Sequence, residues 1–374
     1  MVTYKTILRR LGKEKFAAAA WLVWLTIEVS PGMLDFYPGY GLPTGVACLL
    51  MFALLLGCVF SVVRHADDLA ERLGEPYGTL VLTLSATSIE TALMLSLMMA
   101  GEQNPTLLRD TVFATLMVVL NGLVGVSLTA GGWRHVEQAF NLRGALAFLH
   151  IIAPLSLMIL VLPNYTTDQR AILMPAQEGF MGVLCILVYA IFLRLQVGRH
   201  RSHFDHVAEA GSALGMEEGS EMRIHSIPGS LAALAIALMP IMLLSESMAT
   251  LLETQIQELK LPAALGGLMV TCLVLAPEGL GALKAAMDNR VQRSINICLG
   301  SALSTIDLTI PTVLVAAAVL GHSLILGIDA LSVTLLYASL TVAIITFISG
   351  RANLLQGIVH LMIFAAYLFF MFYP

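Results

Sequence analysis

Two short stretches decide how this chain folds: Ser-Ala-Thr-Ser-Ile-Glu-Thr at residues 85–91 and Leu-Ala-Pro-Glu-Gly-Leu-Gly at residues 275–281. Each places a glutamate, Glu90 or Glu278, inside an apolar run long enough to cross a bilayer. An acid at the centre of a bilayer costs about 2.5–3.5 kcal/mol on insertion scales, so such residues usually mark ion pathways. The two stretches therefore predict an ion site inside a membrane protein.

The composition agrees with this interpretation. Of the 374 residues, 58% are hydrophobic and only 12% are charged, and the mean hydropathy is +0.85. Soluble domains carry about 25% charged residues, so an ordinary soluble enzyme is excluded. The net charge of −5 gives no general basic patch, so the sequence predicts no nucleic-acid partner. It predicts no cofactor, and it allows a homo-oligomer.

Apolar windows of bilayer length predict an all-α integral membrane protein with eleven transmembrane helices. With the N-terminus in the cytoplasm, seventeen of the twenty Lys and Arg residues lie in cytoplasmic segments, and only Arg109, Arg170 and Lys260 lie outside. The positive-inside rule thus favours a cytoplasmic N-terminus and an external C-terminus. The windows are 15–31, 43–63, 78–100, 111–131, 144–163, 179–197, 229–250, 262–286, 293–320, 328–348 and 352–372.

One long polar stretch, 198–228, divides the chain. It is rich in His and acidic residues, which suits either a solvated linker or a weak cation or pH sensor. The expected organisation is a cytoplasmic N-terminus with an accessory helix (1–35), a first five-helix unit (36–197), the linker, and a second five-helix unit (229–374).

A third acid at membrane depth, Asp307, follows a polar stripe on the ninth window. Calcium takes six to eight oxygen ligands, so neighbouring hydroxyls and amides are candidates to complete a site. We expect cation and proton binding by Glu90, Glu278, Asp307, Asn121, Thr87, Ser301 and Ser304, with the three acids as metal ligands. Pro277 and the glycines after Glu278 are expected to weaken their helix and free carbonyls. His65, Asp67 and Glu246 are candidate gate or proton-relay residues near the two mouths.

The third and fourth windows resemble the eighth and ninth. Glu90 is followed by Ala114-Thr115 and then Asn121, whereas Glu278 is followed by Gly300-Ser301 and then Asp307, at the same offset. An odd number of predicted helix crossings separates the two copies, so they must face opposite ways. The pattern predicts an inverted repeat, which places a site at the midplane between its copies.

Several motifs are similar to the ChaA-type bacterial cation/proton antiporters of the calcium/cation antiporter superfamily. They are residues 60–67, residues 74–78, residues 277–285 and the Gly300-Ser301 pair. The resemblance implies one accessory helix followed by two inverted five-helix repeats. The exchanger signature Gly-Asn-x-x-Glu reads Ala86-Thr87-Ser88-Ile89-Glu90 here and Val274-Leu275-Ala276-Pro277-Glu278 in the second copy, so both asparagines are absent.

The resulting hypothesis is a secondary antiporter of a bacterial inner membrane that exchanges Ca2+ for protons by alternating access. Exchange of Na+ or K+ for protons at the same site is the alternative. A cation channel is more remote, and an intramembrane enzyme is disfavoured because the sequence has no His-Glu-x-x-His, Gly-x-Ser-x-Gly or P-loop motif. The expected partners are inorganic cations, protons and the lipid bilayer.

Overall fold

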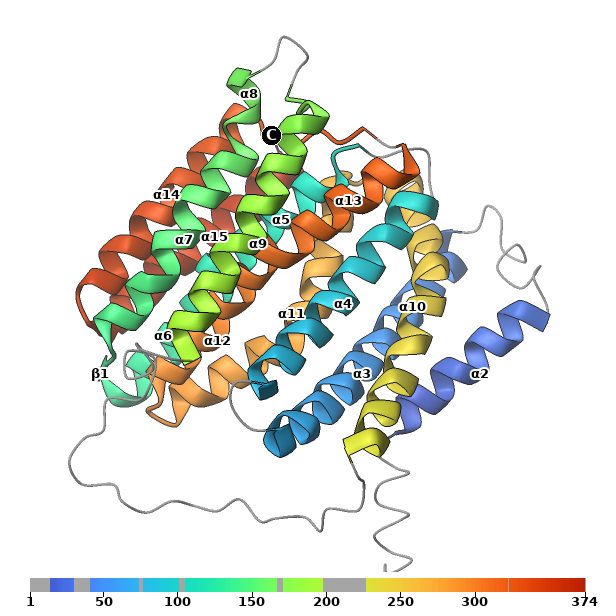
Figure 1. Ribbon diagram of the computed structural model, residues 1–374, viewed down its shortest axis with the longest axis horizontal. Helices are drawn as coiled ribbons and strands as arrows, with labels where there is room; N and C mark the ends of the chain where they lie inside the picture. The colour runs from blue at the N-terminus through green and yellow to red at the C-terminus, as the bar shows by residue number, and fades with distance from the viewer. Residues whose placement is uncertain are drawn as a thin grey trace, which may run out of the picture.

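The structure, a computed structural model, describes residues 14–29, 41–73, 77–100, 105–166, 171–197, 227–321 and 323–373. Long helices packed side by side make up most of this part of the chain (Figure 1). In chain order the elements are α2 (Lys15–Val29), α3 (Gly41–Leu73), α4 (Tyr77–Ala100), α5 (Leu107–Met117), η2 (Val118–Leu123), α6 (Val124–His135), β1 (Glu137–Ala139), α7 (Leu142–Leu160), α8 (Pro163–Thr166), α9 (Pro175–Val197), α10 (Ile227–Glu258), α11 (Ala264–Met287), α12 (Val291–Ser304), η4 (Thr305–Thr309), α13 (Ile310–Leu320), α14 (Ala330–Ile348), β2 (Arg351–Asn353) and α15 (Leu354–Phe372).

Within the described ranges, nine helical segments are long and apolar enough to cross a membrane. The predicted windows 15–31 and 78–100 coincide with α2 and α4, which are helical but are not among these nine. Large apolar side chains such as Leu49, Val319 and Leu355 are exposed, as expected of surfaces that face lipid. The chain is therefore a helical, multi-pass membrane protein. Of the predicted linker, only residues 227 and 228 fall inside the described part.

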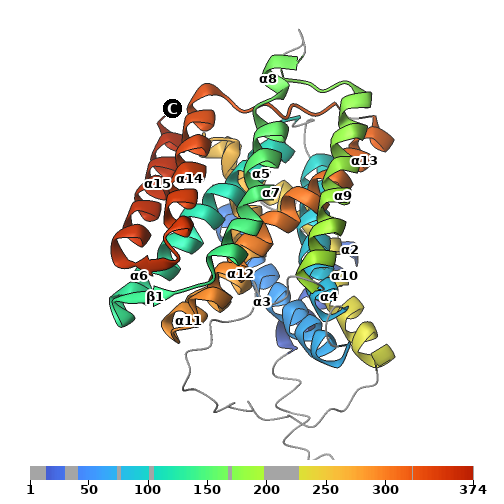
Figure 2. The ribbon, with the colours of Figure 1, turned by 60° about the vertical axis from the view of Figure 1, so that its left-hand side comes forward.

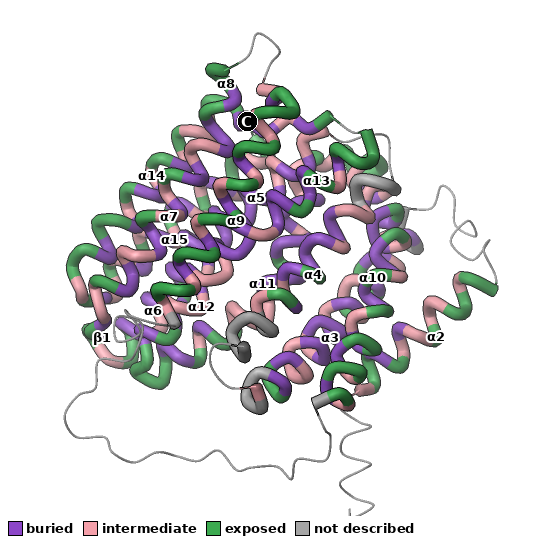
Figure 3. Tube along the Cα trace, in the orientation of Figure 1, coloured by how far each residue is buried: buried purple, intermediate pink, exposed green. Residues whose placement is uncertain are grey.

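Two helical rods run through the middle of the bundle. In the most apolar window of the α5–η2–α6 rod, 89% of the residues are buried, and in that of the α12–η4–α13 rod 61% are buried. The corresponding share is 22% for α9 and for α15 (Figure 3). Each rod changes from α-helix to π-helix for one turn, at Val118–Leu123 and at Thr305–Thr309. A π turn closes its hydrogen bonds from residue i to i+5. Side chains beyond it therefore point in other directions than an unbroken α-helix would give them.

The buried apolar residues form two clusters. One is built mainly on α5 to α7 and α12 to α14, and the other on α3 and α10 with a contribution from α2. Figures 1 and 2 show α14 at one edge of the bundle and α10 toward the other. Helices α4 and α11 contribute to both clusters: Ile89 and Val274 to one, Met94 and Leu275 to the other. The two helices that carry the glutamates thus form the seam between the clusters.

Helices from before and after the predicted linker are interleaved throughout, because each apolar cluster draws on both. Antiparallel strands β1 and β2 add a further link, pairing Glu137 with Asn353 and so joining the α6–α7 and α14–α15 connections. The expected weak point at Pro277 is wrong for this structure, since α11 is helical from Ala264 to Met287. Neighbouring helices can hold a proline-containing membrane helix in shape despite its missing N–H donor.

Candidate functional site

Glu90 lies on α4 and is 5% exposed. Its carboxylate accepts hydrogen bonds from two hydroxyls of the π turn η4. The Thr305 hydroxyl lies 3.2 Å from Oε1 and 3.0 Å from Oε2, and the Thr309 hydroxyl lies 2.7 Å from Oε2. Hydrogen bonds to an ionised acceptor are stronger than those between neutral groups, so η4 holds this carboxylate firmly.

Glu278 lies on α11, close enough to Glu90 and to Asp67 for the charges of the three groups to interact. Its Oε2 is buried and has no hydrogen-bond partner within the described part of the chain. The side chain lines a cavity of about 430 Å³ formed by α3, α4, α7, α9, α11 and α12. Glu278 therefore has a water-sized path to one face of the protein, whereas Glu90 is enclosed by η4.

Other predicted ligands lie around this cavity. Ser301 and Ser304 of α12 line it, and the Ser304 hydroxyl donates to the Ser301 carbonyl at 2.9 Å. Thr87 is 8% exposed and lies one turn before Glu90. Its hydroxyl finds no partner among the described residues, and neither does that of Thr91. Three of the predicted hydroxyl ligands are thus near the two glutamates.

Asp307 and Asn121 do not face the same space as the glutamates. Asp307 is fully buried, and neither of its oxygens has a hydrogen-bond partner in the described ranges. It lies near Cys185 and Tyr189 of α9. Asn121 is directed toward α14, where its amide donates to the Ser339 hydroxyl at 2.8 Å.

This structure does not bring Asp307 together with Glu90 and Glu278, so the role of Asp307 as a metal ligand stays a prediction. The physical reason for the separation is the helical spacing, because residues two apart on a helix point to nearly opposite sides. Thr305 and Thr309 lie two residues on either side of Asp307 and face Glu90, so the aspartate points to the other side of the rod. Within the described ranges no three His, Cys, Asp or Glu side chains gather closely enough to hold a metal ion.

The candidate gate residues lie in three different settings. Asp67 lines the outer part of the cavity and is exposed. His65 instead pairs with Glu14 at the start of α2, with Nε2 3.4 Å from the carboxylate. Glu246 is exposed on α10 and does not line this cavity or the packed region described next. The structure thus brings only Asp67 of the three to the route toward Glu278.

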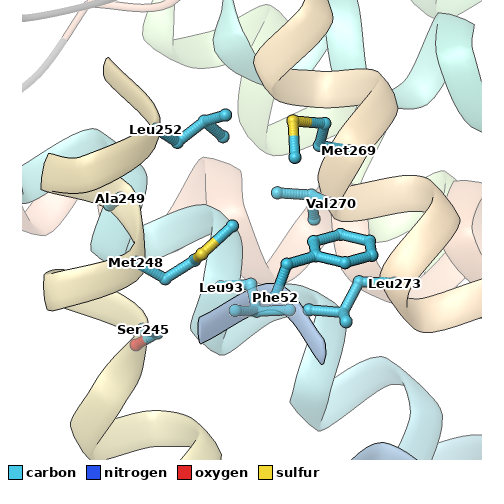
Figure 4. A pocket seen from close by; sticks show the side chains of 9 residues that line it. All are labelled: Phe52, Leu93, Ser245, Met248, Ala249, Leu252, Met269, Val270 and Leu273. Atoms are coloured by element: carbon cyan, nitrogen blue, oxygen red, sulfur yellow. The ribbon is translucent and has the colours of Figure 1, made fainter. Parts of the chain in front are cut away.

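On the other side of the glutamates, α3, α4 and α11 pack tightly against α10. Residues of α3, α4, α10 and α11 point toward one another across a space of only about 10 Å³ (Figure 4). Ser96 and Ser245 are hydrogen-bonded beside it. The Thr115 and Thr271 hydroxyls, 3.1 Å apart, join α5 to α11. Such a space holds about one water molecule, so the described residues leave far less room on this side of the glutamates than in the cavity.

Sequence reasoning missed Thr305 and Thr309. Their signal was a pair of threonines at i and i+4, which puts two hydroxyls on one helical face. The pair was overlooked because Asp307, between them, was taken as the ligand of this stretch.

Comparison with known proteins gives the family. The sodium/calcium exchanger protein family matches residues 44–198 and 229–373. The sodium-potassium/proton antiporter ChaA of Escherichia coli (strain K12) is 38% identical over 334 residues, covering 87% of this chain and 89% of that protein. The putative ionic transporter y4hA of Sinorhizobium fredii (strain NBRC 101917 / NGR234) is 41% identical over 326 residues, covering 86% and 88%.

Solved structures share the fold. The native YfkE structure matches with a TM-score of 0.72 and 14% identity, covering 96% of this chain and 99% of that one. The H+/Ca2+ exchanger CAX matches with a TM-score of 0.68 and 15% identity, covering 98% and 89%. The resemblance drawn from the motifs is confirmed, and these relatives are exchangers and antiporters rather than enzymes. The chain belongs to the sodium/calcium exchanger protein family.

Proposed function

We propose that this protein is a secondary active cation/proton antiporter that works by alternating access. One observation carries the proposal. Two membrane-buried glutamates, from helices far apart in the sequence, meet at a seam that is open to a cavity on one side and packed shut on the other. That is the arrangement expected of an exchanger held in one of its two access states.

The chemistry of the two carboxylates explains the exchange. Two negative charges in a low-dielectric site cannot both persist without compensation. Either bound cations or two protons can neutralise Glu90 and Glu278, so cation and proton binding exclude each other. Only a neutralised site can change its exposure from one face to the other at low cost. Alternation between the two kinds of neutral site moves cations one way and protons the other.

We propose Ca2+ as the first candidate cation, because one divalent ion balances two carboxylates. Thr87, Ser301, Ser304 and water would supply further oxygens. Na+ or K+ is the second candidate. It is favoured by the similarity to the sodium-potassium/proton antiporter ChaA and by the position of Asp307 and Asn121, which face away from the glutamates and leave fewer protein oxygens at the site.

We also propose the full topology: α2 as an accessory helix, followed by two inverted five-helix units, α3 to α9 and α10 to α15. The matching π turns support this, because Asn121 and Asp307 occupy equivalent places in them. The distribution of Lys and Arg supports a cytoplasmic N-terminus in a bacterial inner membrane. The cavity would then open to the cytoplasm, since it lies toward the C-terminal end of α3 and the N-terminal end of α12.

Proton flux in proteoliposomes tests the function. With an acidic interior, addition of Ca2+, Na+ or K+ outside is expected to drive proton efflux for the cation that the protein accepts. Glu90→Gln and Glu278→Gln should each abolish the flux, because an amide cannot bind or release the exchanged proton. Flux with Na+ or K+ but not Ca2+ would select the second candidate.

Glu246→Gln is the matched comparison, since it removes an acid that is exposed and outside the cavity. It should retain exchange, and a loss as complete as that of Glu278→Gln would restore Glu246 as a relay residue. Unchanged transport by both site variants would refute the two-glutamate site. Absence of flux with every cation would refute antiport itself.

A further inference from the structure

The two carboxylates of the proposed site are held in unequal ways. Both oxygens of Glu90 accept hydrogen bonds from η4, through Thr305 and Thr309, which are 2% and 0% exposed. Glu278 has a buried Oε2 with no partner within the described residues. One half of the site is therefore fixed and the other is only partly satisfied.

The two threonines behave differently from several other helical threonines of this chain. Membrane-helix threonines commonly donate to the carbonyl one turn earlier. Thr312 donates to the Leu308 carbonyl at 2.7 Å, and Thr334 to the Ala330 carbonyl at 2.9 Å. Thr305 and Thr309 donate to Glu90 instead. A hydroxyl has only one proton to give, so both donors of this face of η4 are used on the carboxylate.

The corresponding turn near Glu278 carries no such donors. Counting from Asn121 and Asp307, Val119 and Leu123 of η2 stand where Thr305 and Thr309 stand in η4. Leu123 does lie against the glutamate's helix, since a Cβ at Gly279 would come 2.8 Å from its methyl. Val119 and Leu123 have no side-chain hydrogen-bond donor for a carboxylate. The difference between the half-sites therefore comes from the amino acids of the two π turns.

We propose that Thr305 and Thr309 are positioning residues that hold Glu90 as the fixed cation ligand, while Glu278, on the side of the cavity, is the ligand that is not held in this way. This inference rests on the proposed antiport. Both hydroxyls donate to the Glu90 carboxylate, and hydrogen bonds to a charged acceptor are strong enough to fix the direction in which its oxygens face a cation. Glu278 lacks these donors and lines the cavity.

The test compares variants of these two threonines in proteoliposomes. Thr305→Val with Thr309→Val keeps the side-chain volume but removes both hydroxyls. The apparent KM for the transported cation should rise by about tenfold or more, because hydrogen bonds to charged groups are worth at least about one decade in affinity. At a fixed cation concentration, the pH of half-maximal exchange should move upward, since protons compete more effectively. Thr305→Ser with Thr309→Ser should restore both values.

Thr312→Val is the control for loss of a hydroxyl on the adjoining helix, and it should leave KM and pH profile unchanged. Melting temperatures in detergent identify a variant that fails to fold, and the single Thr309→Val variant then replaces the double one. Wild-type KM and pH profile in the valine variants would overturn the inference. Serine variants as impaired as the valine variants would also overturn it, because packing and not the hydroxyl would be responsible. If the wild-type protein shows no exchange, the antiport proposal itself has failed.

Discussion

Helices α11 and α5 come into backbone contact on the closed side of the site, and this contact gives a sharp prediction. A Cβ placed at Gly267 would lie 2.9 Å from the Thr111 amide nitrogen and 3.0 Å from the Asp110 carbonyl carbon. One turn further along α11, Thr271 contacts Thr115 at 3.1 Å. Backbone atoms cannot rotate away, so Gly267→Ala must push the two helices apart just where the closed face is held together.

The magnitude follows from the distances. Ordinary contact with a Cβ begins at 3.4 Å, so α11 must retreat from α5 by about 0.5 Å, the difference between 3.4 and 2.9 Å. Overpacking of this kind typically costs about 1–3 kcal/mol, which corresponds to roughly a 5- to 150-fold change in the equilibrium that closes this face. We expect Gly267→Ala to lower the melting temperature in detergent and to slow exchange in proteoliposomes.

The adjacent glycine supplies the control. A Cβ at Gly266 would meet only the Ile256 Cδ1 atom, at 3.8 Å. Alanine is the better helix former by about 0.5–1 kcal/mol, so Gly266→Ala should melt at or above the wild-type temperature and exchange normally. If Gly267→Ala matches Gly266→Ala in both measurements, the close approach of α5 and α11 does not hold this face closed.

Two further variants test the packing of the outer helices. Gly357→Ala on α15 would drive a Cβ against the Thr129 amide nitrogen of α6 and should lower the melting temperature in detergent. Gly179→Ala on α9 meets nothing within 4 Å and should not, so equal melting would contradict the α6–α15 contact. Glu14 is partly buried, which raises the pKa of its carboxyl, but the hydrogen bond from Ser61 and the charges of His65 and Arg64 outweigh this and lower it below the ordinary 4.5. Its stabilising contact is therefore present above pH 4.5 and is lost as the pH falls through the lowered pKa. The melting temperature of wild type should exceed that of Glu14→Gln at neutral pH and approach it in acid, whereas a gap independent of pH would exclude this ionised contact.

The long helices of the fold and the two buried glutamates of the proposed site could be predicted from the sequence. Apolar run length predicted the long helices, because the bilayer imposes a length on any segment that crosses it. Burial cost predicted that Glu90 and Glu278 would matter, and the structure brings them close together. Both arguments depend only on local composition and so needed no knowledge of helix rotation.

The direction of side chains around the central rods could not be predicted in this way. An α-helical stripe through Ser304 and Asp307 assumed 3.6 residues per turn, whereas η4 is a π turn. The stripe placed Asp307 beside the glutamates, whereas Thr305 and Thr309, on the opposite side of the rod, are the residues that face Glu90. Glu246 raised a different problem, because a place near a predicted mouth says nothing about whether a side chain faces a cavity or the outside of the bundle.

The π turns have a consequence for how such a chain can change over time. A π turn arises where a helix holds one residue more than regular α geometry accommodates. Loss of a single residue from Thr305–Thr309 would restore the α-helix and leave the segments on either side of the turn in nearly their present relative rotation. Loss of a residue elsewhere in the rod would instead rotate everything beyond it by about 100° relative to everything before. These two rods should accordingly tolerate the loss of one residue at the π turn more readily than its loss at any other point along their length.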